Sequence, residues 1–258
     1  MPEFSPIDLL RILSSISLLA YSAVQDVDKR EIDDTVWVLL LLAALVLNLG
    51  GALAGSVDVW SWLFLGSLQS MLFWELYSLG AYGGADAKSL VCISFMYPTT
   101  LDRILQGLTS AKATVPLSTF DNAMVLSLVY LLMNSVLNVR LWLRGVTIFE
   151  GLENESWIRK AAALFLLRKV SAQDLSRNPN KFLLAEASGT GGSRRIVFSR
   201  DLGRPLASDV AEGSNNYVFA SPLMPLQLFV LLGLGLALLF GDLILLPSFW
   251  LVRSLPGI

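Results

Sequence analysis

The chain has 258 residues, of which 54% are hydrophobic and only 16% are charged, and its mean hydropathy is +0.62. Soluble domains have about 45–50% apolar and about 25% charged residues. The apolar residues here exceed that share and occur in long blocks, which predicts a membrane protein with several spans. The chain has no His and one Cys, Cys92, which excludes Ser–His and Cys–His catalysis, His-ligated or Cys-rich metal sites, and an intramolecular disulfide. The net charge of −2 argues against nucleic-acid binding, which needs clustered Lys and Arg. An enzyme of this composition must use carboxylates, Lys, Tyr or hydroxyl groups.

A helix needs about 20 apolar residues to cross the hydrocarbon core of a bilayer. By that criterion we expect an all-α polytopic fold with about six transmembrane helices, near residues 7–24, 36–53, 60–79, a short one from about 86, 123–143 and 222–246. The first is not a signal peptide, because it lacks a basic n-region and a cleavage site of small residues. We therefore expect a membrane domain over 1–143, a small cytoplasmic α+β insert over 144–217, and a sixth helix with the C-terminal tail over 218–258.

Within the insert, residues 157–170 have an apolar centre flanked by basic pairs. This pattern fits either a helix in the membrane interface or a short helix in a small core. Residues 181–187 and 194–200 flank four residues rich in glycine, 189–192, and predict a β-hairpin. No Gly-Lys-Ser/Thr follows those glycines, which argues against a phosphate-binding loop.

The distribution of Lys and Arg predicts the orientation. With six spans, the loops at 26–34 and 83–88 and the insert fall on one side, which holds most of the basic residues. The opposite side holds few basic residues, namely Arg11, Arg103, Lys112 and Arg253. We therefore expect the N-terminus outside and both loops in the cytoplasm.

Two carboxyl groups at that face are the candidates for chemistry. Asp26 ends the first span and Asp86 opens the fourth. A carboxylate at a membrane boundary is costly unless it is hydrated or paired, so such residues are functional candidates. Two close carboxyl groups share a proton, and then one takes a proton from water while the other polarises a peptide carbonyl. This is aspartic protease chemistry, and it needs no His, Cys or metal.

Small residues precede Asp86: Gly83, Gly84 and Ala85. They permit close approach of a substrate strand, and glycine also permits positive φ. The alternative is a tight turn between two helices with Asp86 as the N-cap of the second. These residues alone favour neither interpretation.

Two segments resemble a known family, the archaeal preflagellin and prepilin peptidases, which are membrane aspartyl proteases with a GxGD motif. Residues 22–37, Ser-Ala-Val-Gln-Asp-Val-Asp-Lys-Arg-Glu-Ile-Asp-Asp-Thr-Val-Trp, look like the first-aspartate region, and Gly-Gly-Ala-Asp-Ala-Lys at 83–88 looks like the second-aspartate motif. The segment from Pro222-Leu-Met-Pro-Leu226 to Gly241-Asp242 also resembles the end of these proteins. Ala85 replaces the third glycine of GxGD.

The resemblance implies that Asp26 and Asp86 are a catalytic pair that removes the short basic leader from preflagellin or type IV pilin-like precursors. It implies cleavage at the cytoplasmic face of the cell membrane, with the lipid bilayer and these precursors as partners and no cofactor. Bacterial relatives often add a cysteine-rich zinc segment and a methyltransferase activity. With one Cys we expect neither here, and no metal site.

Other charged residues are secondary candidates. Glu31, Asp33 and Asp34 form an acidic loop after Asp26, which could attract basic leaders or be a solvated loop only. Together with Gly83, Gly84 and Ala85 they are candidate substrate-binding residues. Lys88 could act on Asp86, bind a lipid headgroup, or be a boundary lysine that extends to the interface. Glu75 lies within the third span, where we expect it to face the interior of the bundle.

Two rival functions differ in class. A proton-coupled transporter would use Asp26, Glu75 and Asp86 as a relay, but both aspartates lie at one face rather than at the midplane, and no inverted repeat is visible. A presenilin-like intramembrane protease would share the second-aspartate motif but should also have a Pro-Ala-Leu segment in a late span, which is absent here.

Overall fold

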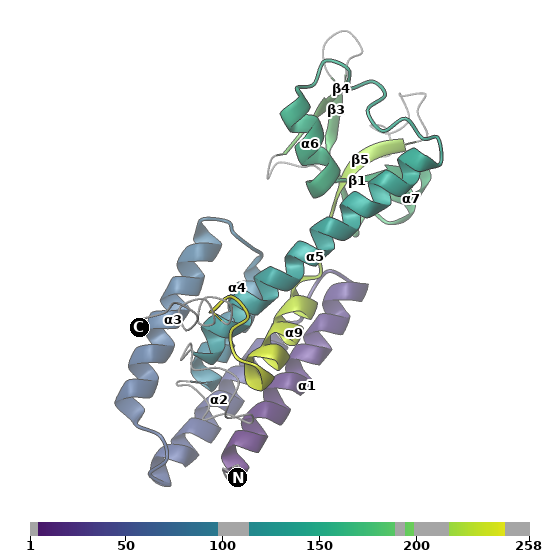
Figure 1. Cartoon of the computed structure of the whole chain (residues 1–258). Coiled ribbons are helices and arrows are strands. Elements are labelled where there is room, and N and C mark those ends of the chain that lie inside the picture. The colour runs from purple at the N-terminus through teal and green to yellow at the C-terminus, as the bar shows by residue number, and fades with distance from the viewer. Residues whose placement is uncertain (1–4, 98–113, 189–193, 199–216, 246–258) are drawn as a thin grey trace, which may run out of the picture. The chain divides into compact units, whose positions relative to one another are not determined.

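The computed structural model describes residues 5–97, 114–188, 194–198 and 217–245 (Figure 1). The chain divides into two compact units, one of Met1–Ser127 with Pro225–Ile258 and one of Leu128–Met224. Three of the basic residues used to predict the orientation, Arg103, Lys112 and Arg253, lie outside the described residues, as do the glycines at 189–192.

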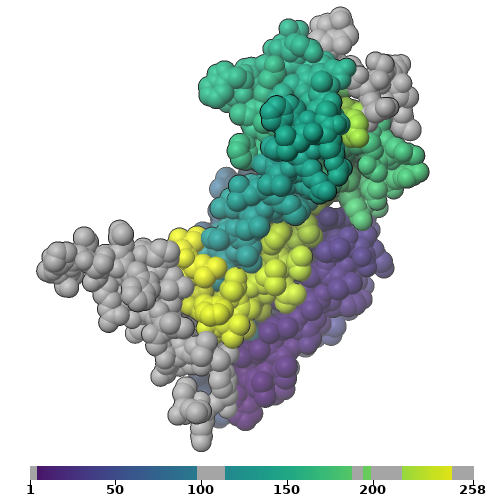
Figure 2. Space-filling model, turned by 45° about the vertical axis from the view of Figure 1, so that its right-hand side comes forward, coloured from purple at the N-terminus to yellow at the C-terminus, as the bar shows by residue number. Residues whose placement is uncertain are grey.

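The first unit is helical. Its helices are α1 (Pro6–Asp28), α2 (Thr35–Leu53), α3 (Val59–Ser78), α4 (Gly84–Met96), the first part of α5 (Val115–Leu143), and α9 (Leu226–Leu239). The short α4 is the centre of the packing, because it contacts α1, α2, α3 and α9. Its apolar face, with Leu90, Ile93 and Met96 almost fully buried, lies in the core of this unit. Figure 2 shows α9, in yellow-green, lying along α1, in purple.

Not all of the expected spans have the length and composition of a membrane-crossing helix. Among the described residues, three helices meet both criteria: α1, α2 and α5. The apolar helix α9 has only 14 residues, and α4 has 13. The sixth span was expected to begin near Pro222, but residues up to Pro222 belong to a strand. Six transmembrane helices are therefore not confirmed, whereas a mostly helical membrane protein is.

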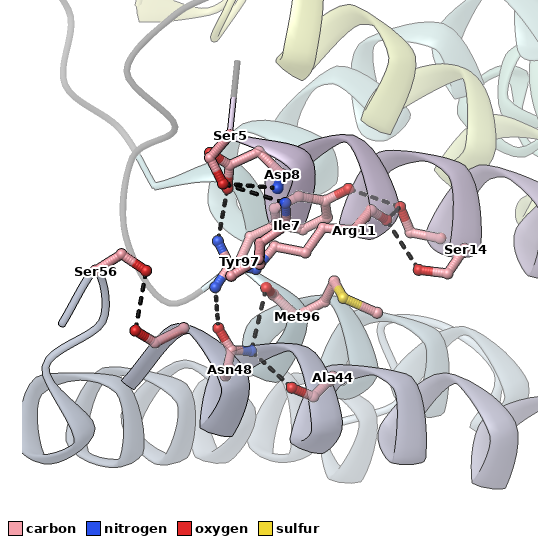
Figure 3. A network of polar contacts seen from close by, with 12 residues as sticks. Ser5, Ile7, Asp8, Arg11, Ser14, Ala44, Asn48, Ser56, Met96 and Tyr97 are labelled. Atoms are coloured by element: carbon pink, nitrogen blue, oxygen red, sulfur yellow. Dashed lines mark hydrogen bonds and ion pairs between the residues drawn. The ribbon is translucent and has the colours of Figure 1, made fainter. Parts of the chain in front are cut away.

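A buried polar network ties together α1, α2 and α4 (Figure 3). The Arg11 guanidinium donates to Asp8 Oδ1 at 2.7 Å and to Asn48 Oδ1 at 2.5 Å. Asn48 in turn donates to the carbonyl oxygens of Ala44 in α2 and Phe95 in α4. A buried cation is tolerated only when it is paired and hydrogen-bonded. The network explains how a charge near the start of the first span can be buried.

The second unit contains the last part of α5, the helices α6 (Trp157–Leu166) and α7 (Ala172–Arg177), and five strands. The strands are β1 (Arg168–Ser171), β2 (Phe182–Leu184), β3 (Glu186–Ser188), β4 (Arg194–Ile196) and β5 (Tyr217–Pro222). One antiparallel sheet has the order β1-β5-β2, and β3 pairs with β4 separately. The pairing of Glu186 with Ile196 and of Ser188 with Arg194 confirms the expected hairpin next to the glycines. Residues 182–184, expected in the same strand, instead form β2 and pair with β5.

The predicted helix over 157–170 is too long by four residues. It ends at Leu166, and residues 168–171 form β1, where Val170 lies opposite Val218 of β5. Leu167 already has extended backbone, and the strand that follows buries Lys169 and Val170 beside β5. On α6, Ala163 is buried in the core of this unit, whereas Trp157 and Phe165 are exposed. The helix thus has one face in a small core and an apolar face that the described residues leave uncovered.

A buried ion cluster stabilises the same unit. The Lys169 ammonium lies 3.4 Å from Glu186 Oε1, and the Arg194 guanidinium lies 3.2 Å from Glu186 Oε2. Lys169 also lies over the ring of Phe219, 4.5 Å from its centroid. Burial lowers the pKa of Lys169, and the Glu186 carboxylate opposes that shift. Removing one partner of such a cluster leaves a buried charge unpaired. This destabilises a protein more than replacing the whole cluster by apolar residues of similar volume.

Close packing of α9 on α5 depends on one glycine. A Cβ atom at Gly233 would lie 2.5 Å from the carbonyl oxygen of Thr119 and 2.9 Å from the amide nitrogen of Ala123. Both atoms belong to the backbone of α5 and cannot rotate away. Small residues at helix contacts let backbones approach closely in membrane proteins, so Gly233 sets the separation of the two helices.

We expect Gly233→Ala to destabilise the detergent-solubilised protein by about 1–3 kcal/mol, the usual cost of overpacking. The matched control is Gly235→Ala in the same helix, where a Cβ would meet nothing within 4 Å and where alanine is the better helix former. Thermal unfolding of the two variants checks this. Equal melting temperatures would contradict the role given to Gly233.

Candidate functional site

Asp26 lies in the last turn of α1, and its side chain is 14% exposed. After the helix ends, Arg30 takes a left-handed conformation with φ of 59°. This turn brings its guanidinium back along the helix, to 3.8 Å from Asp26 Oδ1. The Nη1 and Nε atoms of Arg30 are buried and have no hydrogen-bond partner among the described residues. A cation therefore lies beside Asp26 without being hydrogen-bonded to it.

Asp86 lies in the first turn of α4 and is almost buried. Its Oδ2 accepts a hydrogen bond of 3.2 Å from the backbone N–H of Gly83, the N-cap residue. Asp86 is thus three residues beyond the N-cap, rather than the N-cap itself as one interpretation expected. Its carboxylate reaches back to satisfy an amide that the helix leaves without a partner.

The residues before Asp86 do not use left-handed backbone. Gly83 has φ of −78°, and Gly84 and Ala85 already belong to α4. The positive φ in this connection is at Gly80, with φ of 78°, three residues before the motif. The positive φ that glycine permits is therefore not used at Gly83 or Gly84. Ala85 in place of a third glycine carries no conformational cost, because alanine is the best helix former.

Gln227, in the first turn of α9, joins the two aspartates. Its backbone N–H donates to Asp26 Oδ2 at 3.2 Å, and its side-chain Nε2 donates to Asp86 Oδ1 at 2.9 Å. The side chain is fully buried. Both carboxyl groups therefore lie within hydrogen-bond distance of one residue, so Asp26 and Asp86 share one site although 60 residues separate them.

Helix ends shape the electrostatics of this site. The first backbone amides of a helix have no partner within it, and the helix dipole places partial positive charge there. Asp26 accepts from such an amide of α9, and Asp86 lies at the corresponding end of α4. Each carboxyl group thus faces a helix N-terminus, whose amides partly offset the cost of burying it.

Two buried hydroxyl groups complete the contacts of Gln227. Ser22 Oγ donates to its Oε1 at 3.4 Å, and Nε2 also lies 3.2 Å from Ser89 Oγ. Both serines are fully buried. The described residues contain no group of three or more His, Cys, Asp or Glu side chains arranged to hold a metal ion.

The acidic loop after Asp26 is exposed. Glu31, Asp33 and Asp34 all face solvent. The backbone N–H and the hydroxyl of Thr35 donate to Asp33 and lower the pKa of that carboxyl group. Asp34 pairs with Lys88 at 2.6 Å; the Asp34 side chain is largely exposed and that of Lys88 partly so. Lys88 thus has its closest charged partner in this loop and not in Asp86.

Glu75 and Tyr82 lie near the second-aspartate motif in sequence but have different surroundings. Glu75 is exposed on α3, so the expectation that it faces the interior of the bundle is wrong, and a relay of Asp26, Glu75 and Asp86 loses its middle member.

Tyr82 donates to the Phe73 carbonyl at 2.6 Å. Burial, with the nearby Asp86 carboxylate, raises the pKa of Tyr82 to about 12, so its phenol remains protonated.

A family model matches residues 13–141, half of the chain, and its description is the type IV leader peptidase family. The chain belongs to the type IV leader peptidase family. No curated protein matches the sequence. The segment shared with this leader peptidase family contains Asp26, Asp86 and the loops around them, and the expected relationship to prepilin and preflagellin peptidases is confirmed.

Gln227 lies outside the segment that matches the family and was missed by sequence analysis. One signal could have found it: it is the only polar side chain in the apolar stretch Leu226–Leu239. A lone amide in such a stretch needs partners. In this member of the leader peptidase family, those partners include Asp86, while the backbone N–H of the same residue donates to Asp26.

Proposed function

We propose that the protein is a membrane aspartic endopeptidase that removes the short basic leader from preflagellin or type IV pilin-like precursors. Membership of the type IV leader peptidase family supports leader-peptide processing by a membrane protease. The observation that favours the aspartic type is the hydrogen bonding of Asp26 and Asp86 to one residue. No His is available in the chain as a base, and its one Cys, Cys92, is buried.

In this proposal the two carboxyl groups share one proton, as closely spaced carboxyl groups do. The ionised group takes a proton from a water molecule, whose oxygen attacks the carbonyl carbon of the scissile peptide bond. The protonated group gives its proton to the carbonyl oxygen, which forms a tetrahedral intermediate. Collapse of the intermediate breaks the C–N bond, and the leaving nitrogen takes the proton from the first carboxyl group. As the carbonyl re-forms, a hydroxyl of the intermediate returns its proton to the second carboxyl group, so the pair again shares one proton.

The location of the pair suggests how substrate would meet it. Asp26 is at the end of α1, next to the exposed acidic loop, and the distribution of Lys and Arg favours the cytoplasmic side for this loop. Substrates with a basic segment before a hydrophobic helix would bring that segment to Glu31, Asp33 and Asp34. Gly83, Gly84 and Ala85, which lack large side chains, would leave room for the extended backbone near the scissile bond. With one Cys, we propose no zinc segment and no methyltransferase activity.

Replacing either aspartate should abolish cleavage. For Asp26→Asn and Asp86→Asn we expect kcat to fall by at least about 10²–10⁴-fold, the contribution typical of a general acid or base. The assay is loss of the leader from a purified pilin-type precursor, followed by gel shift, with the enzyme in membranes. The matched control is Asp28→Asn, since Asp28 is an exposed carboxylate in the same turn of α1. Near-normal cleavage by either site variant would rule out the pair.

Neutralising the acidic loop should weaken binding of basic leaders without slowing the chemical step. We expect Glu31→Gln with Asp33→Asn to raise KM about 2–5-fold at low salt, as exposed charges contribute little each, and to have less effect at high salt. The control is Asp58→Asn, an exposed N-cap carboxylate of α3, since asparagine caps equally well. If KM changes equally with salt in the loop variant and in Asp58→Asn, the acidic loop is solvated and has no role in binding.

The glycines of the motif should differ in their tolerance of alanine. A Cβ at Gly83 would lie 3.0 Å from Asp86 Oδ2, whereas at Gly84 the nearest atom is the hydroxyl oxygen of Tyr77, 3.6 Å away. We expect Gly83→Ala to displace the Asp86 carboxyl group and lower kcat up to about tenfold, because small misplacements are costly in catalysis. Gly84→Ala, which does not approach Asp86, should lower kcat less in the same gel assay. Equal effects of the two substitutions would show that close contact with Asp86 is unimportant.

A further inference from the structure

Burying the polar side chain of Gln227 in the core of a membrane protein costs free energy. It is the only polar side chain of α9 and is fully buried. An amide moved into an apolar environment without partners costs several kcal/mol. Such a group persists in the fold only where its hydrogen-bonding capacity is used, so its contacts indicate its role.

Those contacts come from two other helices, α4 and α1. The side chain donates to Asp86 and contacts Ser89 in α4, and it accepts from Ser22 in α1. The backbone N–H of the same residue donates to Asp26. Gln227 therefore contacts Asp86 through its side chain and Asp26 through its main chain. Ser22 and Ser89 orient the side chain.

We propose that Gln227 is a positioning residue that holds the carboxyl groups of Asp26 and Asp86 at a fixed separation for peptide hydrolysis. The inference rests on the proposed function, since it concerns the same pair. It goes beyond the family match, which ends at residue 141. The two contacts are separable by mutation, because any side chain except proline leaves the backbone N–H that binds Asp26.

Three substitutions separate positioning from packing. Gln227→Met keeps the length of the side chain but removes the donor to Asp86. Gln227→Glu restores a donor only at acidic pH, where its own carboxyl group is protonated. Gln69→Met is the control, because Gln69 is a buried glutamine of α3 whose Oε1 has no hydrogen-bond partner among the described residues.

We expect Gln227→Met to lower kcat by about 10–100-fold with KM within about twofold of wild type, the pattern of a loss confined to the transition state. Its pH profile should also change, and Gln227→Glu should regain activity relative to Gln227→Met as the pH falls. Gln69→Met should behave as wild type. Wild-type kcat in Gln227→Met, or a ratio of the Glu and Met variants that is constant with pH, would overturn the proposal.

A second measurement works without turnover. Melting temperatures of Gln227→Met, Asp86→Ala and the double variant form a double-mutant cycle, and residues in direct contact give non-additive effects. We expect the double variant to lose less than the sum of the single losses. Additive losses would overturn the contact itself.

The two measurements also distinguish this proposal from the proposed function. If the wild type fails to cleave pilin-type precursors but the cycle is non-additive, the proposed substrate is wrong and the pairing of Gln227 with Asp86 stands. If the wild type cleaves and Gln227→Met cleaves equally well, the peptidase stands and the positioning role is overturned.

Discussion

A carboxyl group that is buried among apolar helices needs hydrogen-bond donors, and this requirement determines how the helices of the first unit meet. Asp26 and Asp86 find theirs at the N-terminal ends of α9 and α4, where backbone amides lack partners within their own helices. Gln227 contributes to both. Two of the donors to the aspartates are therefore backbone amides that every helix N-terminus has. The third is the side-chain amide of Gln227, which has to be buried for this purpose.

Much of this site could be predicted from the sequence. The positions of Asp26 and Asp86 at the ends of apolar segments follow from hydropathy alone, and α1 and α2 extend close to the predicted bounds. The expectation that both aspartates lie at one face rested on a count of six spans, whereas the structure brings them together through Gln227. Their local geometry was less accessible: Ala85 and the glycines before it are ordinary backbone, and the left-handed residues are Gly80 and Arg30 instead.

The remaining differences have a common physical origin. Hydropathy measures how apolar a segment is but does not indicate which side of a helix is covered, so Glu75 was expected to be buried although it is exposed. It also cannot separate a strand from the helix that follows it, so the last helix was expected from about Pro222, within the end of β5. Gln227 was missed because a single amide hardly changes the average of a segment, whereas its partners are 138 to 205 residues away.

The order of the chain has a consequence for biosynthesis. Both aspartates come from the first 86 residues, but the residue that joins them belongs to α9, which follows the whole of the second unit. A ribosome makes the pair early and its bridge late. During synthesis the two carboxyl groups are thus made before their shared donor, and the contacts of Gln227 with Asp26 and Asp86 form only once α9 has joined α1 and α4.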